Sequence, residues 1–408
     1  MIYILSPLPP KKTGTADYIR LLSRSLKESF GDRYETEIVF CDQLEKNTDC
    51  SIGNCIDIND LHIEKEDLIV LTLASNKYHK WIWEFLAQYK QSAHLLSIIH
   101  DLSAYGLICD MVSEGKFNFS YDEWNYSLQT EYGFISSKLV SDGWRLPSGS
   151  KYFILAQGLT VSKSDEIFVH SLYAKNCLQT FSVKGVQVPP VTVVGHSIYD
   201  LKLNSQMGVN VDKKIFKLGV VGWWSAIKQP ELVIRSFWHF YRSLSDEYKN
   251  NIKLYFVGNI EKAELLNQKK KLRQIGLDEK VEFVGYVDEI SLNSWIKSFD
   301  LMFNLRFPSC GETSGTLARA KFLGTRTVTT NFAAFREEYA TYHVSVEPRK
   351  ELLQLIDILQ AEWKRWNSGL EDFKLLETYT GDSEEIIKND IGSEIFRLHE
   401  SIQLASFS

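Results

Sequence analysis

Short β-type runs alternate with amphipathic stretches through most of the chain, and this alternation limits the fold more than any other feature of the sequence. In the first half, we expect buried strands at residues 2–6, 37–40, 68–74, 95–100, 151–155, 166–170 and 192–194. These runs have valine, isoleucine and leucine on both faces, as strands of a parallel sheet covered by helices do. Helical spacing lies between them at residues 17–30 and 78–91. The first half therefore predicts a doubly wound α/β domain.

A second alternation of the same kind follows a polar stretch at residues 199–214, which we interpret as a linker. Its expected strands are 216–222, 252–258, 281–285, 301–305 and 326–329, and its expected helices are 231–244, 261–275, 290–299 and 313–323. We predict two doubly wound domains that face each other across a cleft. The expected parts are an N-terminal domain at 1–205 with a polar, aromatic insertion near 106–150, a C-terminal domain at 206–375, and a C-terminal helix in 376–408 that packs back on the N-terminal domain.

Charge and cysteine usage exclude several classes of protein. A net charge of -6 argues against a dedicated nucleic-acid binder. The six cysteines include no Cys-x-x-Cys pair, so we expect reduced thiols and no metal site. Apolar runs such as residues 68–74 are far shorter than the roughly 20 residues of a membrane span, and the first residues are strand-like rather than typical of a signal peptide. We expect a cytoplasmic protein, with peripheral contact at the inner face of the plasma membrane left open.

The segment from Asn304 to Gly324 has the most informative chemistry. A strand ends near residue 305, a turn follows, and a helix is expected to start near Thr313. Free backbone amides of Thr313, Ser314 and Gly315 at a helix start form an anion site. Glu312 stands just before them, where a carboxylate could hold a sugar hydroxyl. An ordinary capped helix start with no ligand is an equally good interpretation of this spacing.

Three other strand ends hold weaker candidates. Gly222 ends a strand and precedes Lys228, whose ammonium could neutralise a diphosphate, although a solvated lysine is the more common case. Gly14 and Thr15 lie in a loop between the first strand and a helix. His100 ends another strand, and so does His196, where structural hydrogen bonding is the more frequent role of histidine.

Together these segments resemble the retaining glycosyltransferases of family 4 (glycosyl transferases group 1), which have the GT-B fold. The resemblance covers most of the chain in order. The matching segments are residues 9–18, 165–171 and 193–196, the pair Gly222 and Lys228, residues 281–287 followed by Asp300, and residues 311–315. The last of these looks like the family's donor-phosphate loop and is the most specific match.

The resemblance implies a role for each matched residue. Glu312 and His100 would face the transferred sugar and are the expected catalytic residues. The distal phosphate would bind Thr313, Ser314 and Gly315, and the remaining donor-binding residues would be Gly222, Lys228 and Arg306 at the pyrophosphate, Val284, Tyr286 and Val287 at the nucleobase, and Gly14 and Thr15 near the phosphates. Neither a metal nor a cofactor is expected, since the nucleotide-sugar is a co-substrate.

Two departures from the family pattern concern the same site. A second glutamate is expected eight residues after Glu312, where this chain has Ala320, and an arginine usually found after the glycine is Trp223. The expected activity is that of a metal-independent, retaining hexosyltransferase. It would use a UDP- or GDP-type donor and a saccharide, lipid-linked or protein-linked glycan acceptor in bacterial surface polysaccharide assembly. A non-catalytic glycosyltransferase-like partner subunit and a GT-B nucleotide-sugar epimerase are the alternatives.

Overall fold

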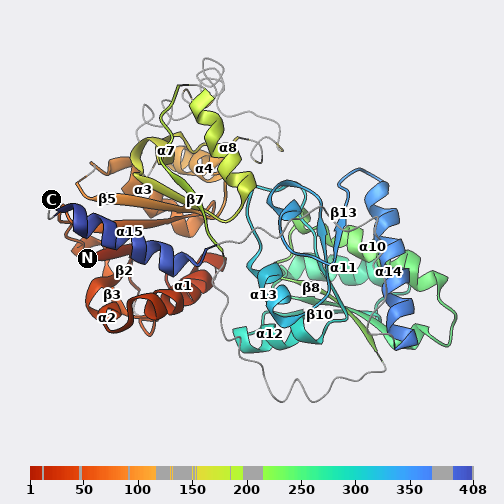
Figure 1. Ribbon diagram of the computed structural model, residues 1–408. Helices are drawn as coiled ribbons and strands as arrows, with labels where there is room; N and C mark the ends of the chain where they lie inside the picture. Colours follow the sequence, from red (N-terminus) through yellow and green to blue (C-terminus); the bar gives the residue numbers. More distant parts are fainter. Residues whose placement is uncertain are drawn as a thin grey trace. The chain divides into compact units, whose positions relative to one another are not determined.

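The protein is α/β, as expected, and consists of two compact units (Figure 1). The computed structural model describes residues 1–11, 13–45, 48–90, 92–115, 129, 131, 149, 152, 154–183, 185–195, 215–369 and 389–406. Unit 1 comprises Met1–Ser197, Cys310–Thr313 and Ile387–Ser408, and unit 2 comprises Ile198–Ser309 and Ser314–Ile386. The expected linker and most of the expected insertion lie outside the described residues, as does His196.

Unit 1 is built on a sheet that has seven strands in the described part of the chain. They are β1 (Ile2–Leu5), β2 (Ile38–Asp42), β3 (Asn54–Asp57), β4 (Leu68–Leu73), β5 (His94–Ile99), β6 (Glu166–Val169) and β7 (Val191–Val193). Every recorded pairing is parallel, and the order is β3-β2-β1-β4-β5-β6-β7. The order reverses between β1 and β4, which is where ligands of doubly wound sheets bind.

Helices cover both faces of this sheet. They are α1 (Gly14–Phe30), α2 (Tyr34–Glu37), α3 (Lys80–Gln88), α4 (Tyr105–Glu114), α7 (Gly158–Lys163), α8 (Leu172–Val183) and α15 (Ile391–Ser406), with 3-10 turns η1 (Gly31–Arg33), η2 (Ile58–Asp60) and η3 (Lys77–His79). On one face, α1 and α15 bury apolar side chains against β1, β2 and β4. On the other, α3 and α4 do the same. Parallel strands covered on both faces explain why the runs are apolar throughout.

Helix α15, which contains the last described residues, packs beside α1, the first helix (Figure 1). Ser25 on α1 donates to the Asp390 carboxylate at 2.9 Å and accepts from the Gly392 amide at 3.0 Å. A Cβ atom added to Gly392 would lie 2.2 Å from the Ser25 hydroxyl oxygen. The two helices therefore approach so closely that only glycine fits at this position.

Unit 2 repeats the topology with six strands among its described residues. They are β8 (Phe216–Val221), β9 (Ile252–Val257), β10 (Val281–Gly285), β11 (Leu301–Asn304), β12 (Thr327–Thr330) and β13 (Tyr342–Val344), in the order β10-β9-β8-β11-β12-β13. All of the recorded pairings are again parallel. The reversal of strand order falls between β8 and β11, so the carboxyl ends of these two strands mark the expected ligand edge.

The helices of unit 2 form one layer on each face of the sheet. They are α10 (Pro230–Ser243), α11 (Lys262–Gln274), α12 (Glu289–Ser298), α13 (Gly315–Leu323) and α14 (Lys350–Ser368), with 3-10 turns η5 (Ala226–Lys228), η6 (Lys249–Asn251) and η7 (Ala333–Arg336). Side chains of α10, α11 and α14 share one apolar cluster with the sheet, and those of α12 and α13 share the other.

The structure differs from the sequence expectation in three strands. One expected strand is absent from the described residues, and two strands are present that were not expected. Ile154 and Leu155, within the run expected as strand 151–155, are not in a strand. The Leu155 amide donates to the Glu131 carboxylate at 2.8 Å, and its carbonyl accepts from the Ala104 amide, so this backbone pairs with a loop instead of a sheet. The added strands are β3 and β13, at the outer edges of the two sheets.

The long helix α14 is anchored to the sheet of unit 2 by a buried carboxylate. Glu362 is only 1% exposed and accepts from Arg326, Arg365 and the Tyr342 hydroxyl, the last at 2.6 Å. Burial, together with the Glu362 charge, raises the pKa of Tyr342 to about 12, so the phenol stays a donor at neutral pH. Two arginines and a phenol share one carboxylate, and its removal leaves them without their common acceptor.

We predict that Glu362→Ala lowers the unfolding free energy of unit 2 by about 3 kcal/mol, because buried ion pairs are costly to break from one side. The measurement is urea unfolding combined with hydrogen exchange in β12 and α14. Glu347→Ala is the matched control, since Glu347 forms an exposed ion pair with Lys350 just before the same helix. That pair is worth under about 1 kcal/mol. Equal losses in the two variants would contradict the anchoring role.

Candidate functional site

The edge of the unit 2 sheet at β8 and β11 is organised around the start of α13. The Asn304 amide, at the end of β11, donates to the Ser314 hydroxyl oxygen at 3.0 Å. That oxygen also accepts from the Leu317 amide at 3.2 Å and so caps α13. Gly315 is exposed, and a Cβ atom placed there would meet only open space. The first turn of α13 has backbone amides without intrahelical partners and open space beside Gly315, and the helix dipole favours an anion there.

Two loops at this edge are bound to each other. The Phe307 amide donates to the Ile227 carbonyl at 2.8 Å, and the Gln229 side chain donates to the Phe307 carbonyl at 2.8 Å. The Thr330 hydroxyl, at the end of β12, holds the Arg306 carbonyl at 2.9 Å. The connection from β8 to α10, which contains Lys228, is thus fixed against the connection from β11 to α13, which contains Arg306. The structure brings the backbones of both predicted cationic residues to one sheet edge, while the Arg306 guanidinium lies over the Phe335 ring, 5.9 Å from its centroid.

Gly222 is necessary for the position of Lys228. Its φ of +107° is unfavourable for residues with a side chain, and a Cβ atom there would lie 2.1 Å from the Lys228 amine nitrogen. The ammonium group therefore lies directly over the glycine backbone at the end of β8. This arrangement agrees with the pairing of the two residues expected from the sequence, while their role in phosphate binding stays a prediction.

Two further glycines continue this surface across the sheet. Gly258 follows β9 at φ +143° and Gly285 ends β10 at φ +87°. The Gly222 amide donates to the Val257 carbonyl and the Gly258 amide donates to the Gly285 carbonyl, each at 2.8 Å. A Cβ atom on Gly258 would lie 2.1 Å from the Gly222 carbonyl oxygen. We call Gly222, Gly258 and Gly285 the glycine row, since three neighbouring strands end in residues without side chains.

From the sequence, Gly222 was expected at the phosphates and Gly285 only as part of the nucleobase segment 281–287, whereas Gly258 was not expected at the site. The available signal was a glycine at the end of three successive expected strands. Beyond the row, Val284 and Val287 are half-buried against the apolar cluster of α12 and α13, whereas Tyr286 is 64% exposed. The expected nucleobase segment thus offers one exposed ring and a glycine-ended strand.

The departure at Ala320 has a structural explanation. Ala320 is completely buried and packs in the cluster that contains Val221 and Met302. A carboxylate at this position would lie inside the apolar core and could not meet a ligand. The neighbouring Arg319 is also buried, and its guanidinium donates to Asn293 at 2.9 Å and to Glu289 at 3.1 Å.

The remaining predicted residues belong to unit 1. They are Gly14, Thr15, His100, Glu312 and Thr313. Glu312 and Thr313 are both half-buried. The predicted site residues therefore form two sets, one in each unit. The contacts that position the unit 1 residues come from unit 1 itself.

In unit 1, His100 belongs to a cluster of three rings. It follows β5, and its ring stacks on His170 at 5.2 Å between centroids and meets the edge of Tyr18 at 4.4 Å. His170 follows β6, and its Nδ1 donates to the Val194 carbonyl at 3.1 Å. Burial and the nearby Asp390 charge raise the pKa of Tyr18 far above its usual value, so the phenol is neutral. These contacts fix the His100 ring at the carboxyl edge of the sheet.

The loop before α1 is supported from β4. The Thr13 and Thr15 hydroxyls are 3.0 Å apart, and the Asn76 amide donates to Thr13 at 3.4 Å. Asn76 in turn accepts from His79 Nδ1 at 3.0 Å. Burial lowers the pKa of His79 to about 3, so the imidazole is neutral at neutral pH. A buried, neutral histidine thus supports the start of α1, and Gly14 and Thr15, which were expected in a loop, lie in the first turn of this helix.

Metal-binding clusters and membrane-spanning helices are both absent from the described residues. No group of three or more histidine, cysteine or acidic side chains there could hold a metal ion. No helix in the same part of the chain is both long and apolar enough to cross a bilayer.

The family comparison bears on unit 2. Residues 215–360, which include the glycine row, Lys228 and α13, match the family described as Glycosyl transferases group 1. The resemblance to that family is confirmed over this segment. No curated protein matches the chain.

Solved glycosyltransferase structures resemble the whole chain in fold. HepE from Anabaena in complex with UDP-glucose has a TM-score of 0.56 at 12% identity and covers 99% of each chain. Sucrose-phosphate synthase from Thermosynechococcus elongatus has a TM-score of 0.57 at 13% identity, with 99% of each chain covered. The catalytic domain of starch synthase IV from Arabidopsis thaliana, bound to ADP and acarbose, has a TM-score of 0.56 at 10% identity and covers 99% of this chain and 98% of its own. At such identities the likeness concerns the fold, which is GT-B.

The glycine row leads to a prediction about stability. We expect Gly258→Ala to lower the unfolding free energy of unit 2 by about 3 kcal/mol, since the new methyl group would collide with the Gly222 backbone at an unfavourable φ. Gly276→Ala is the matched control, because Gly276 has φ +70° but nothing within 4 Å of the added Cβ, and it should cost about 1 kcal/mol. Hydrogen exchange in β8 and β9 checks the location. Equal losses in both variants would show that the contact is unimportant.

His79 leads to a prediction about pH. Its folded pKa lies below its unfolded value, so the unfolded chain binds the extra proton and stability falls as pH decreases through about 6.5. Between pH 7 and pH 5 this histidine alone should remove about 2 kcal/mol of stability. Burial also lowers the pKa of His94, His343 and His399, which adds to the loss, whereas burial raises the pKa of Asp42 and Asp300, which acts in the opposite direction.

The corresponding measurement is urea unfolding at both pH values for the unmodified protein, His79→Asn, and His62→Asn as an exposed control. His79→Asn should reduce the difference between the two pH values, whereas His62→Asn should leave it unchanged. An unaltered difference in His79→Asn would refute a buried neutral imidazole.

Proposed function

We propose that the protein is a glycosyltransferase that takes a sugar from a nucleotide diphosphate donor, of UDP or GDP type, and transfers it to a saccharide acceptor. The observation on which this rests is the edge of unit 2 at β8 and β11. There the start of α13, with open space beside Gly315, follows a loop with Arg306, and that loop is bound to the loop that places Lys228 over Gly222. Helix-start amides with two cations match the charge of a diphosphate. The matched family, Glycosyl transferases group 1, supports the same choice.

Ser314 has a defined part in this proposal. Its oxygen already accepts from Asn304 and Leu317, which uses both lone pairs. The hydroxyl proton is then the group left to interact with a ligand, and it can only donate. A donor hydroxyl beside the first amides of α13 suits a phosphate oxygen.

The nucleoside would lie along the glycine row. Side-chain-free backbone at Gly222, Gly258 and Gly285 allows a flat ligand to approach closely. The backbone around Val284, Tyr286 and Val287 would meet the base at the end of this row. In HepE and starch synthase IV, the bound molecules are UDP-glucose and ADP with acarbose, respectively, which is consistent with a nucleotide-sugar donor here.

The chemistry would depend on stabilising the leaving group. The bond between the sugar C1 and the diphosphate oxygen breaks, and its electron pair stays on the diphosphate. Lys228, Arg306 and the α13 amides stabilise that negative charge in a site already oriented for it. We propose that these groups, rather than a divalent metal, supply the positive charge.

The acceptor side of the proposal concerns unit 1. The acceptor oxygen would form its bond to C1 on the face that the diphosphate leaves, so configuration is retained, and its proton would pass to the departing oxygen. Glu312 and His100 would orient the transferred sugar. The acceptor would be a saccharide or a lipid- or protein-linked glycan, and bacterial surface polysaccharide assembly in the cytoplasm is the context suggested by the family resemblance.

We predict that Lys228→Ala weakens binding of UDP or GDP about 10- to 100-fold, since a charge-assisted hydrogen bond contributes about 1.5–3 kcal/mol. The corresponding nucleoside should bind equally well to both forms. Calorimetric titration measures both, and Lys262→Ala, an exposed lysine at the start of α11, is the control that should leave affinity unchanged.

The same titrations separate the alternative functions. No binding of any nucleoside diphosphate would overturn the donor site. Nucleotide binding without turnover of the corresponding nucleotide-sugars would favour a non-catalytic partner subunit. Release of free nucleotide with an altered sugar, in the absence of acceptor, would favour an epimerase.

A further inference from the structure

A second concave site lies in unit 2, between the connection from β8 to α10 and the connection from β9 to α11. It is a cavity of about 620 Å³, within the range of roughly 300–1,000 Å³ that is typical of ligand pockets. It lies at the starts of α10 and α11. The lining residues are Trp223, Trp224, Ser225, Ala226, Gln229, Pro230, Glu231, Leu232, Asn259, Glu261 and Glu264.

The two tryptophans of this cavity differ in their packing. Trp224 packs against Phe256 at 5.1 Å and Phe283 at 5.7 Å between ring centroids, and its amide donates to the Asn259 carbonyl at 2.9 Å. Trp223, the next residue along the same loop, is 50% exposed. Its backbone is therefore anchored on both sides, by Gly222 and by Trp224, while its indole ring borders the cavity. An ordered, exposed indole is a suitable surface for stacking against a ligand.

The charges of the cavity differ from those of the proposed diphosphate site. Its lining, as far as the structure describes it, has the carboxylates of Glu231, Glu261 and Glu264 and neither lysine nor arginine. Hydrogen bonds from Lys271 and then Gln268 lower the pKa of Glu231, so this carboxylate is ionised at neutral pH. Glu231 is paired with Lys271 at 2.7 Å, so the charges of Glu261 and Glu264 are the ones that disfavour a phosphate here. The cavity therefore suits an uncharged ligand with hydroxyl groups to donate.

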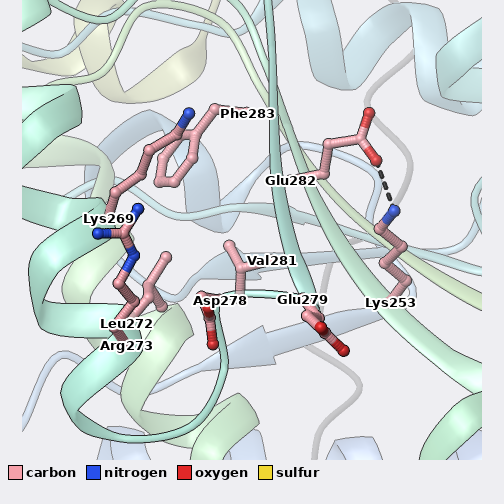
Figure 2. Close-up of a pocket in the computed structure, with 9 residues that line it drawn as sticks. All are labelled: Lys253, Lys269, Leu272, Arg273, Asp278, Glu279, Val281, Glu282 and Phe283. Atoms are coloured by element: carbon pink, nitrogen blue, oxygen red, sulfur yellow. Dashed lines mark ion pairs between the residues drawn. The ribbon is translucent and has the colours of Figure 1, made fainter.

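A neighbouring cavity in the same unit is different in character. Figure 2 shows it between α11 and the edge strand β10, with the Lys253–Glu282 ion pair marked, and its volume is about 520 Å³. Cations and carboxylates line it together, and its apolar side chains, among them Leu272 and Phe283, belong to or pack against the unit 2 core. It has no exposed aromatic ring among its lining residues. This cavity gives no reason to expect a ligand.

We call the first of these two cavities the Trp223 cavity, after its exposed indole. We propose that the Trp223 cavity binds a neutral saccharide. The indole ring of Trp223 would stack on the apolar face of one sugar ring, and the carboxylates of Glu261 and Glu264 would accept from its hydroxyls. The Asn259 amide can both donate and accept at the opposite wall. The assignment of this cavity as a subsite for the sugar chain of the transferase rests on the proposed function. Binding of a saccharide to the cavity can nevertheless be measured without sugar transfer.

The test is a titration of the full chain with maltotriose, cellotriose, mannotriose and tri-N-acetylchitotriose, all of which are neutral. Calorimetry gives the affinities, and fluorine NMR of protein labelled with 5-fluorotryptophan gives the location. The Trp223 signal is assigned by its loss in Trp223→Phe. We expect at least one trisaccharide to bind and to shift this signal, and we expect Trp223→Ala to lower its affinity at least tenfold.

Two variants refine this test. Trp223→Phe keeps a ring and should retain part of the affinity, and Phe322→Ala, which removes an exposed ring elsewhere in unit 2, should retain all of it. The proposal is overturned if no trisaccharide binds or if Trp223→Ala binds as well as the unmodified protein. It is also overturned if UDP shifts the Trp223 signal and displaces the saccharide, because the cavity would then hold the nucleoside.

Failure here and failure of the donor site are distinguishable. UDP and GDP are titrated into the same protein and into Lys228→Ala. Retained nucleotide binding without any saccharide binding removes only the Trp223 cavity from consideration. Saccharide binding without nucleotide binding removes the proposed donor site and leaves the cavity.

Discussion

The carboxyl edge of unit 2 depends on a contact between two stretches of backbone. Gly258 lies so close to the Gly222 carbonyl that no side chain fits between them. Because these strand ends lie against each other, the loop after β8 turns back over the sheet, and Lys228 comes to lie on Gly222. The loop after β11 is then bound to this loop through Phe307. The position of Lys228 follows from that contact, whereas the start of α13 is held by Asn304 and the Arg306 backbone by Thr330.

In the two proposals, the same edge separates two kinds of ligand chemistry. On the α13 side, helix amides and two cations favour negative charge. On the α10 and α11 side, three carboxylates and an exposed indole favour an uncharged ligand. The loop from Gly222 to Lys228 contributes to both regions. Trp223, near its start, lines the cavity, and Lys228, at its end, lies over Gly222. A single connection of a few residues can therefore discriminate between the charged and uncharged parts of a substrate pair.

The sequence was sufficient for the fold class and for most strands, since parallel strands buried on both faces leave long apolar runs. The expected strand at 151–155 was wrong in its described part, because an apolar run cannot by itself distinguish a strand from a buried connection. Strand β3 was missed because its residues are mostly half-exposed at a sheet edge.

The candidate site was predictable to a smaller extent. The pairing of Gly222 with Lys228 follows local spacing, whereas Gly258 and Gly285 become a common surface only after the order of three strands is known. The carboxylate expected at position 320 would be buried in an apolar core that depends on residues distant in sequence. The roles of the site residues remain predictions.

The return of α15 to α1 has a consequence for how the protein is made. When the ribosome has added Ile386, unit 2 is complete, but unit 1 still lacks Ile387–Ser408. The apolar face of α1 that receives Ile391 and Ile395 therefore stays uncovered on the ribosome while the later unit can already fold. Unit 1 is therefore synthesised first but completed last. Its completion includes the packing of Gly392 against Ser25.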